Sequence, residues 1–244
     1  MHAHGCGVGS DAGEKELMEH GFTWLHALPF PEHITTALLV ALLLLVFALR
    51  VRPKLTNTDD AIDPDDGVSA RNIAEVVVEF VSGLTEGVIG EHFERYVPLL
   101  AAFFVFILVA NLIGLVPGFL PPTSNFNVTL GLGLISFLAY NVYAVKAIGV
   151  GSHLKHFMGP VLLLAPLMFV VELFSQSFRP ISLGIRLFAN MFADHEVVSI
   201  FTSLTKVGVP VLFYVLGAFV CVVQAFVFTM LSAIYISLSV SHDH

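Results

Sequence analysis

Charged side chains are scarce in this sequence. Only 30 of its 244 residues, 11 basic and 19 acidic, carry a charge, about half the share of an average soluble protein. Four stretches carry none: residues 34–49, 97–145, 157–171 and 207–240. Uncharged apolar runs of this length are typical of membrane helices, since a bilayer core takes ~20 residues per crossing. This composition excludes a nucleic-acid-binding protein and a disordered tail.

Cysteine is rarer still, with two residues in the chain. Cys6 lies in a polar N-terminal stretch and Cys221 in an apolar run, so we expect two unpaired thiols and no disulfide scaffold. The N-terminal stretch also holds five histidines without the cysteine neighbours and regular spacing of a metal site: His2, His4, His20, His26 and His33. We therefore expect no metal centre and no cofactor.

The apolar runs predict an all-α membrane protein with about five membrane helices and one amphipathic surface helix. We expect four parts along the chain: a polar lead (1–33), a first membrane helix with an acidic loop and the surface helix (34–95), a membrane hairpin (96–150) and a final part (151–244). The surface helix covers residues 69–91, where apolar residues recur at helical spacing and three carboxylates lie opposite them: Glu75, Glu79 and Glu86.

Two uncharged or nearly uncharged segments are too long for one perpendicular crossing. Turn-forming residues between 117 and 125 divide the first segment into helices at about 96–115 and 128–145. Residues 157–206 would form ~75 Å of helix against a ~30 Å bilayer core. This second segment either crosses twice, with a break at Pro180, or forms one strongly tilted helix.

Basic residues indicate the orientation in the membrane. If the helices at 34–49, 96–115 and 128–145 all cross, only Lys15 and Lys206 fall on one side, and seven basic residues fall on the other: Arg50, Arg52, Lys54, Arg71, Arg95, Lys146 and Lys155. Cytoplasmic loops are enriched in Lys and Arg. We therefore expect the N-terminus outside and the C-terminus in the cytoplasm.

Six ionisable residues interrupt the apolar sequence between 157 and 206: Glu172, Arg179, Arg186, Asp194, His195 and Glu196. A charge at bilayer depth costs at least ~2.5–3.5 kcal/mol on insertion scales, so such groups face protein or water and usually mark an ion path. For Glu172 and Arg179, the alternative to an ion path is a salt bridge between the two side chains that only stabilises the fold.

The spacing of these residues favours a polar path. Glu172, Arg179 and Arg186 are seven residues apart and share one helical stripe, which Asn190 continues one turn beyond Arg186. Gln224 lies near the middle of the last apolar run, where a buried amide is costly unless a neighbouring helix provides a hydrogen-bond partner.

These residues carry a resemblance to a known family. The stretch RPISLGIRLFANMFA at 179–193, followed by Gln224-Ala-Phe and Ala233-Ile-Tyr-Ile-Ser, resembles subunit a of the F-type ATP synthase. Supporting matches are Asn111-Leu-Ile-Gly-Leu-Val-Pro, Asn127-Val-Thr, and Glu172 fourteen residues before Arg186. The resemblance extends from about residue 20 to the end of the chain, and the arginine motif is highly specific.

The resemblance implies a non-catalytic stator subunit of a bacterial inner-membrane motor. It implies partners in the c-subunit ring, whose membrane-embedded Asp or Glu carries the proton, and in peripheral-stalk b-type subunits. The last two helices would form a long, steeply tilted hairpin, and two half-channels would lead protons to the ring from opposite sides. No Gly-rich phosphate loop is present in the sequence, in agreement with a subunit that does not bind ATP.

Matching positions imply residue roles. Arg186 would be the essential arginine between the half-channels, Gln224 would hold it from the facing helix, and Asn190 would line the path. His195 would relay protons, because its ordinary pKa lies near 6.5. Which of Asp194, Glu196 and Glu172 works with His195 in the relay stays open. Three further residues would support the path or the structure: Arg179, Asn111 and Asn127.

The chain departs from the family pattern at two positions. Residue 217, where the family often has a second ionisable group, is glycine, and residue 194, where glycine is common, is aspartate. Three alternatives stay open: a Na⁺-coupled version of the same subunit, a secondary ion-coupled transporter, and a structural anchor. Transporters commonly have internal repeats, of which the two halves of this sequence give no sign, and an anchor leaves Arg186 and Gln224 unexplained.

Overall fold

Every regular element of the described chain is helical. The computed structural model describes residues 31–56, 69–90, 92–116, 119–149, 165–205 and 208–240, and no strand occurs in these ranges. The prediction of an all-α membrane protein is therefore confirmed. The predicted acidic loop and most of the polar lead lie outside the described residues, as do Cys6, Lys15 and Lys206.

The helices begin and end close to the positions that the hydrophobic pattern predicts. They are α2 (Glu32–Thr56), α3 (Ala70–Ile89), α4 (Val97–Ile113), α5 (Phe126–Ile148), α7 (Ala165–Leu204) and α8 (Gly208–Val240), with two short 3₁₀ turns, η1 (Phe93–Arg95) and η2 (Pro122–Ser124). Side chains cap two of the helices, because the oxygens of Ser69 and Asn125 accept hydrogen bonds from the backbone N–H groups of Arg71 and Asn127. Three described helices contain a span long and apolar enough to cross a membrane: α2, α5 and α8.

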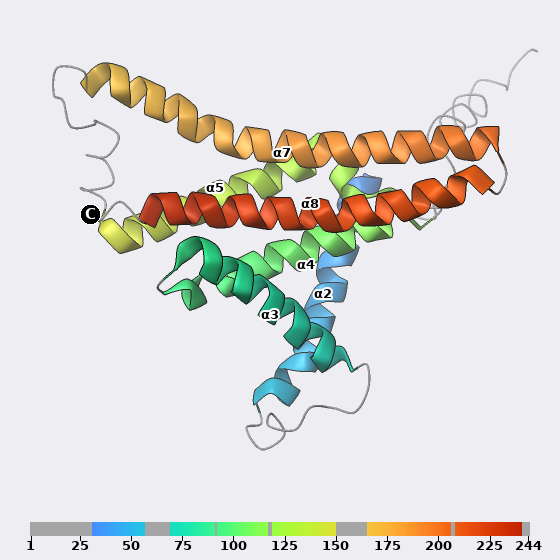
Figure 1. Cartoon of the computed structure of the whole chain (residues 1–244), viewed down its shortest axis with the longest axis horizontal. Coiled ribbons are helices and arrows are strands. Elements are labelled where there is room, and N and C mark those ends of the chain that lie inside the picture. The colour runs from blue at the N-terminus through green and yellow to red at the C-terminus, as the bar shows by residue number, and fades with distance from the viewer. Residues whose placement is uncertain are drawn as a thin grey trace, which may run out of the picture.

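The described part of the long segment at 157–206 forms a single helix. α7 runs through Pro180 without a break and contains 40 residues, which corresponds to a length of ~60 Å. α8 adds 33 residues and lies beside α7 in the opposite direction (Figure 1). The start of α7 and the last turns of α5 and α8 therefore share one end of the molecule, whereas Leu204 and Gly208 lie at the other.

The core lies where α4, α5, α7 and α8 meet. Its fully buried side chains include Leu100 and Ile107 of α4, Leu187 of α7, and Phe228 and Ile236 of α8. α2 and α3 lie on the side of this bundle away from α7 (Figure 1). α7 thus packs against α5 and α8.

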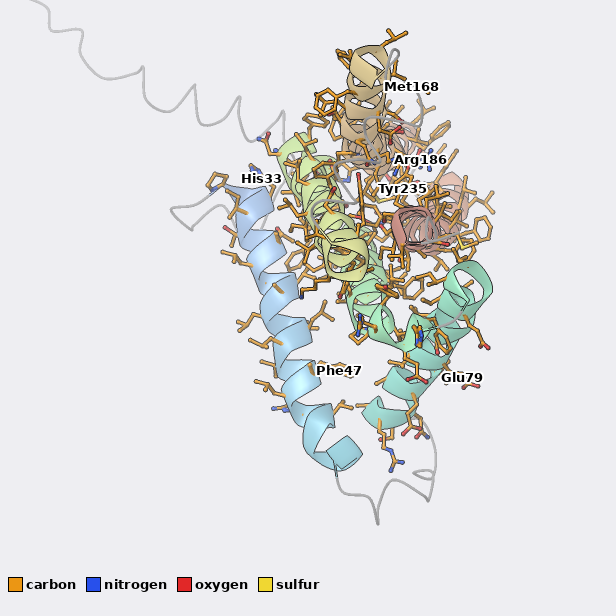
Figure 2. The ribbon with its side chains drawn as sticks, turned by 90° about the vertical axis from the view of Figure 1, so that its left-hand side faces the viewer. His33, Phe47, Glu79, Met168, Arg186 and Tyr235 are labelled. Carbon is orange, nitrogen blue, oxygen red and sulfur yellow. The ribbon has the colours of Figure 1, made fainter. Side chains whose placement is uncertain are left out.

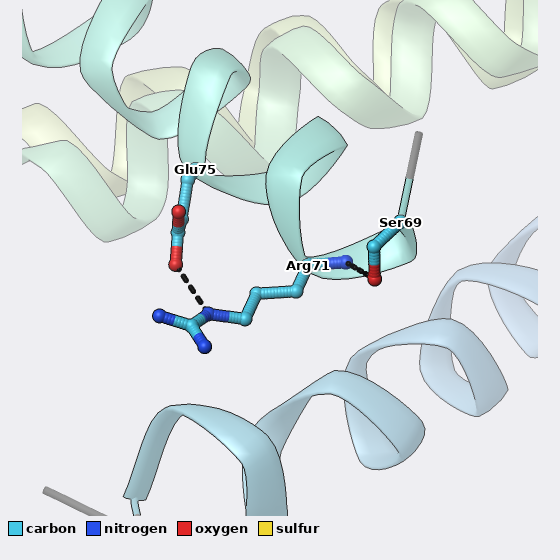
Figure 3. Close-up of polar contacts among 3 residues, drawn as sticks. All are labelled: Ser69, Arg71 and Glu75. Carbon is cyan, nitrogen blue, oxygen red and sulfur yellow. Dashed lines mark hydrogen bonds and ion pairs between the residues drawn. The ribbon is translucent and has the colours of Figure 1, made fainter. Parts of the chain in front are cut away.

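The amphipathic helix α3 packs on its own chain. Phe80 contacts the rings of Phe104 and Phe226 at centroid distances of 5.6 and 6.4 Å, whereas the three carboxylates of its other face are exposed. At its start, Arg71 Nε donates to Glu75 Oε1 at 2.7 Å, and the backbone N–H of Arg71 donates to Ser69 Oγ (Figure 3). These contacts fix the first turn of the helix.

Close contact between α5 and α7 depends on glycine. A Cβ at Gly133 would collide with the Pro180 carbonyl oxygen, and one at Gly184 would lie 3.1 Å from the Leu130 Cα. We expect Gly133→Ala to destabilise the protein by about 1–3 kcal/mol, because the obstructing atom is backbone and cannot turn aside. Thermal unfolding of the purified protein in detergent measures this effect. Gly131→Ala is the control, since a Cβ there meets nothing within 4 Å, and equal melting temperatures for both variants would contradict the prediction.

Candidate functional site

Arg186 occupies an exposed position near the middle of α7. Its neighbours Leu183 and Leu187 are buried and hold the adjoining face of the helix in the core, while Ile185, 47% exposed, lies beside Arg186 on the open side. Figure 2 places Arg186 at the edge of the molecule away from Phe47 of α2 and Glu79 of α3. In the part of the chain that the structure describes, its guanidinium makes no hydrogen bond or ion pair with another residue. It carries a permanent positive charge on the exposed side of α7.

The Gln224 amide contacts Asn190 and not Arg186. Asn190 Nδ2 donates to Gln224 Oε1 at 2.6 Å, and Gln224 itself is only 3% exposed. Asn190 lies four residues after Arg186, one helical turn further along the same stripe of α7. Its bond to Gln224 therefore holds this stripe against α8 one turn away from the Arg186 guanidinium. The buried amide on α8 thus has the interhelical partner that it needs.

A group of ionisable residues follows Arg186 toward the Leu204 end of α7. Asp194 and His195 are half-buried and Glu196 is exposed. A Cβ at Gly217 of α8 would lie 2.6 Å from Asp194 Oδ2 and 3.0 Å from Leu115 Cδ2. The Asp194 carboxylate therefore occupies the space that a side chain at position 217 would need. We call Asp194, His195 and Glu196 the acidic–histidine cluster.

A second polar group precedes Arg186 toward the start of α7. Tyr140 Oη of α5 donates to Gln176 Oε1 at 2.7 Å, and Gln176 Nε2 donates to Glu172 Oε1 at 3.1 Å. The Arg179 guanidinium lies over the Tyr235 ring of α8, 5.3 Å from its centroid. Glu172 and Arg179 form no ion pair in the described residues, so structural ion pairing does not account for this Glu.

The two polar groups lie on opposite sides of Arg186 along one helix. At a rise of 1.5 Å per residue, Glu172 precedes Arg186 by ~21 Å and Asp194 follows it by ~12 Å. Apolar side chains of the core separate the two groups, among them Leu183 and Leu187. The arrangement offers two distinct polar regions with one cation between them.

Two asparagines near the N-terminal end of α5 have structural contacts. Asn111 Oδ1 accepts from Thr123 Oγ1 at 2.7 Å, which joins the end of α4 to η2, and its buried Nδ2 has no hydrogen-bond partner among the described residues. Asn127 is exposed, and its backbone N–H completes the cap of α5. Within this part of the chain, both N–H groups of the Asn111 amide thus lack a hydrogen-bond partner.

Among the described residues, no three His, Cys, Asp or Glu side chains come together in a way that could hold a metal ion.

Comparison with known proteins identifies the family. The family model described as ATP synthase A chain matches residues 33–237. The chain belongs to this family. It is similar to ATP synthase subunit a of Bdellovibrio bacteriovorus, with 45% identity over 91% of this chain and 99% of the relative. It is also similar to the subunits a of Solibacter usitatus, with 40% identity over 89% and 91%, and of Geobacter sulfurreducens, with 37% identity over 96% and 91%.

The family predicted from the arginine motif is thus confirmed, and the chain is a multi-pass membrane protein of the ATP synthase A chain family. Sequence reasoning did not find every polar contact of this subunit. It missed Gln176 and Tyr140, as well as a buried hydroxyl pair between Ser136 and Ser232 at 2.9 Å. Gln176 could have been found, because it lies one turn after Glu172 on the same helical face. Tyr140 gives no such signal within its apolar run.

Proposed function

We propose that this chain is the stator subunit of a rotary F-type ATP synthase, and that it forms two proton half-channels against the c-subunit ring. In this role it couples proton translocation to rotation and to ATP synthesis without binding ATP itself. The observation that carries the proposal is Arg186 on the open face of α7, without a hydrogen bond or ion pair among the described residues and with a polar group on each side of it along the helix.

The role of Arg186 is electrostatic. A fixed guanidinium favours the ionised form of a ring carboxylate that passes it, which promotes release of the proton carried by that carboxylate. Arginine suits this position because it stays charged in apolar surroundings, where lysine can lose its proton. The same charge repels a proton moving directly between the two polar regions. Exposed apolar side chains beside Arg186 on the open side of α7, such as Ile185 and Phe192, provide the surface for the ring.

The acidic–histidine cluster serves one half-channel. His195 carries the proton in this cluster, and Asp194 provides the ionisable group beside α8 that a residue at position 217 would otherwise supply. Glu196 stands at the exposed edge of this cluster. The Asn190–Gln224 pair lines the path toward Arg186. Asn111, near the end of α4, and the exposed Asn127, at the start of α5, are supporting residues.

Glu172 serves the other half-channel, with Arg179 as a supporting residue. This half-channel opens at the end of the molecule that contains the C-terminus of α8, which we assign to the cytoplasm from the distribution of basic residues. The N-terminus then lies outside the bacterial inner membrane. α7 and α8 are each longer than a ~30 Å core requires, so we propose that this hairpin is steeply tilted in the bilayer. Peripheral-stalk b-type subunits complete the stator.

ATP-driven acidification of vesicles that contain the whole complex tests the function and its coupling ion. We expect acidification at full rate in Na⁺-free buffer, abolished by a protonophore. Acidification only in the presence of Na⁺ would assign the subunit to a Na⁺-coupled synthase. Ion transport by the isolated chain without the rest of the complex would support the alternative of a secondary transporter and contradict our proposal.

Replacement of His195 or Asp194 is expected to slow pumping. In the same assay, His195→Ala and Asp194→Asn should each lower the rate by about tenfold or more, because a positioned proton-transfer group typically contributes 10²–10⁴-fold. His195→Ala should also change the pH dependence of the rate. Thr202→Ala is the control, because the exposed Thr202 hydroxyl bonds, within the described chain, only to the Val198 carbonyl of its own helix. If both variants pump at the native rate with the native pH profile, this cluster is not in the proton path.

A further inference from the structure

Glu172 is the last member of a hydrogen-bonded chain that begins in the core. Tyr140, 1% exposed, donates to Gln176, 7% exposed, and Gln176 donates to the half-buried Glu172 carboxylate. The chain therefore leads from the buried face of α5 to the partly open face of α7. The family motif around Arg186 includes neither Tyr140 nor Gln176.

The chemistry of the three groups fixes the direction of this chain. An ionised carboxylate can only accept hydrogen bonds, so the NH₂ end of the Gln176 amide must face Glu172. The amide oxygen is then left for Tyr140, which must donate its hydroxyl proton. In this arrangement both ends of the Gln176 amide have a hydrogen-bond partner.

The surroundings explain why Gln176 holds one position. Arg179 of α7 and Tyr235 of α8 are the titratable groups next to Tyr140, and the Tyr140 and Tyr235 rings lie 6.1 Å apart. These side chains, together with Phe137 at 5.3 Å from the Tyr140 ring, leave the Tyr140 hydroxyl pointing at α7. A buried amide that lost either partner would keep an unsatisfied polar group, which is unfavourable.

From this geometry we propose that Gln176 is a positioning residue for Glu172: it holds the carboxylate in its half-channel, and Tyr140 holds Gln176 in turn. The inference rests on the proposed function, in which Glu172 exchanges protons with the cytoplasm. Gln176 does not carry the proton. It keeps the carboxylate in one place and donates a hydrogen bond that favours its ionised form, so that protons pass between water and the ring at one position.

The test uses ATP-driven pumping by the whole complex in inverted vesicles as a function of the pH outside them, the side that Glu172 faces. We expect Gln176→Met, which keeps the length of the side chain, to lower the rate at neutral pH several-fold. It should also move the half-maximal pH upward by about one unit, because a hydrogen bond to a charged group is lost. Tyr140→Phe should move it in the same direction by less.

Ser136→Ala is the matched control, because it also removes a buried interhelical hydrogen bond of α5 but does not touch Glu172. It should leave the pH profile unchanged. In a Glu172→Gln background, Gln176→Met should cause no further change, since the carboxylate on which it acts is gone. If Gln176→Met prevents assembly of the complex, Tyr140→Phe provides the same test, because it removes a single oxygen atom.

Two results would overturn the inference: a native pH profile for Gln176→Met, or a shift that persists in the Glu172→Gln background. The proposed function fails in a different way. If Glu172→Gln alone leaves both the rate and the pH profile unchanged, Glu172 has no part in proton transfer. If Glu172→Gln changes the profile and Gln176→Met does not, the half-channel stands and only the positioning role is lost.

Discussion

ATP-driven proton pumping is expected to fall to the background of empty vesicles when Arg186 is replaced by Ala. The guanidinium is the one charge that the proposal places between the two polar regions, so its loss removes both the attraction for the ionised ring carboxylate and the barrier to a direct leak. Assembly should be preserved. Arg186 is exposed and, among the described residues, makes no hydrogen bond or ion pair whose partner would be left buried and unpaired.

A graded variant separates charge from shape at this position. Arg186→Lys keeps a positive charge when protonated, but the amine can release its proton in apolar surroundings, so we expect partial pumping at most. Ser177→Ala is the control on the same helix, since the exposed Ser177 hydroxyl bonds only to the Leu173 carbonyl. The amount of assembled complex in the membrane is measured beside the rate. Pumping at the native rate by Arg186→Ala, in a normally assembled complex, would remove the mechanism proposed here.

The sequence predicted most of the fold because hydrophobic runs and their interruptions determine where membrane helices begin and end. Ser69 and Asn125 cap α3 and α5 close to the predicted starts. α2 continues to Thr56, beyond the predicted end at residue 49, so the basic residues that follow residue 49 belong to the helix. The pattern could not decide whether Pro180 breaks the helix, because a proline removes one hydrogen bond but neighbouring helices can satisfy the freed carbonyl.

The site was predicted less completely than the fold. Seven-residue spacing brought Glu172, Arg179 and Arg186 to one stripe of α7, because that periodicity is a property of any helix. Contacts between helices depend on how far each helix is rotated and shifted, which a single sequence does not specify. This is why the partner of Gln224 is Asn190 in the structure, and why the position of Asp194 against Gly217 became visible only when α7 and α8 were placed together.

The central claim is that two aqueous half-channels approach Arg186 from opposite sides of the membrane. Single cysteines at the two polar regions test it, in a chain whose two native cysteines have been replaced by Cys6→Ser and Cys221→Ala. Glu172→Cys marks one region and Asp194→Cys the other. A thiol reacts as the thiolate, which forms in contact with water and not in lipid. Leu38→Cys, at a site that is 62% exposed on the apolar surface of α2, is the control and should stay unlabelled.

The measurement is labelling by a membrane-impermeant thiol reagent, applied to either face of sealed vesicles that contain the whole complex. We expect each of the two cysteines to be labelled from one face of the membrane and not at all from the other. Our account predicts that the cysteine of Glu172→Cys reacts only from the cytoplasmic face and that of Asp194→Cys only from the outer face. Reaction of both from the same face, or of either one from both faces, would contradict it.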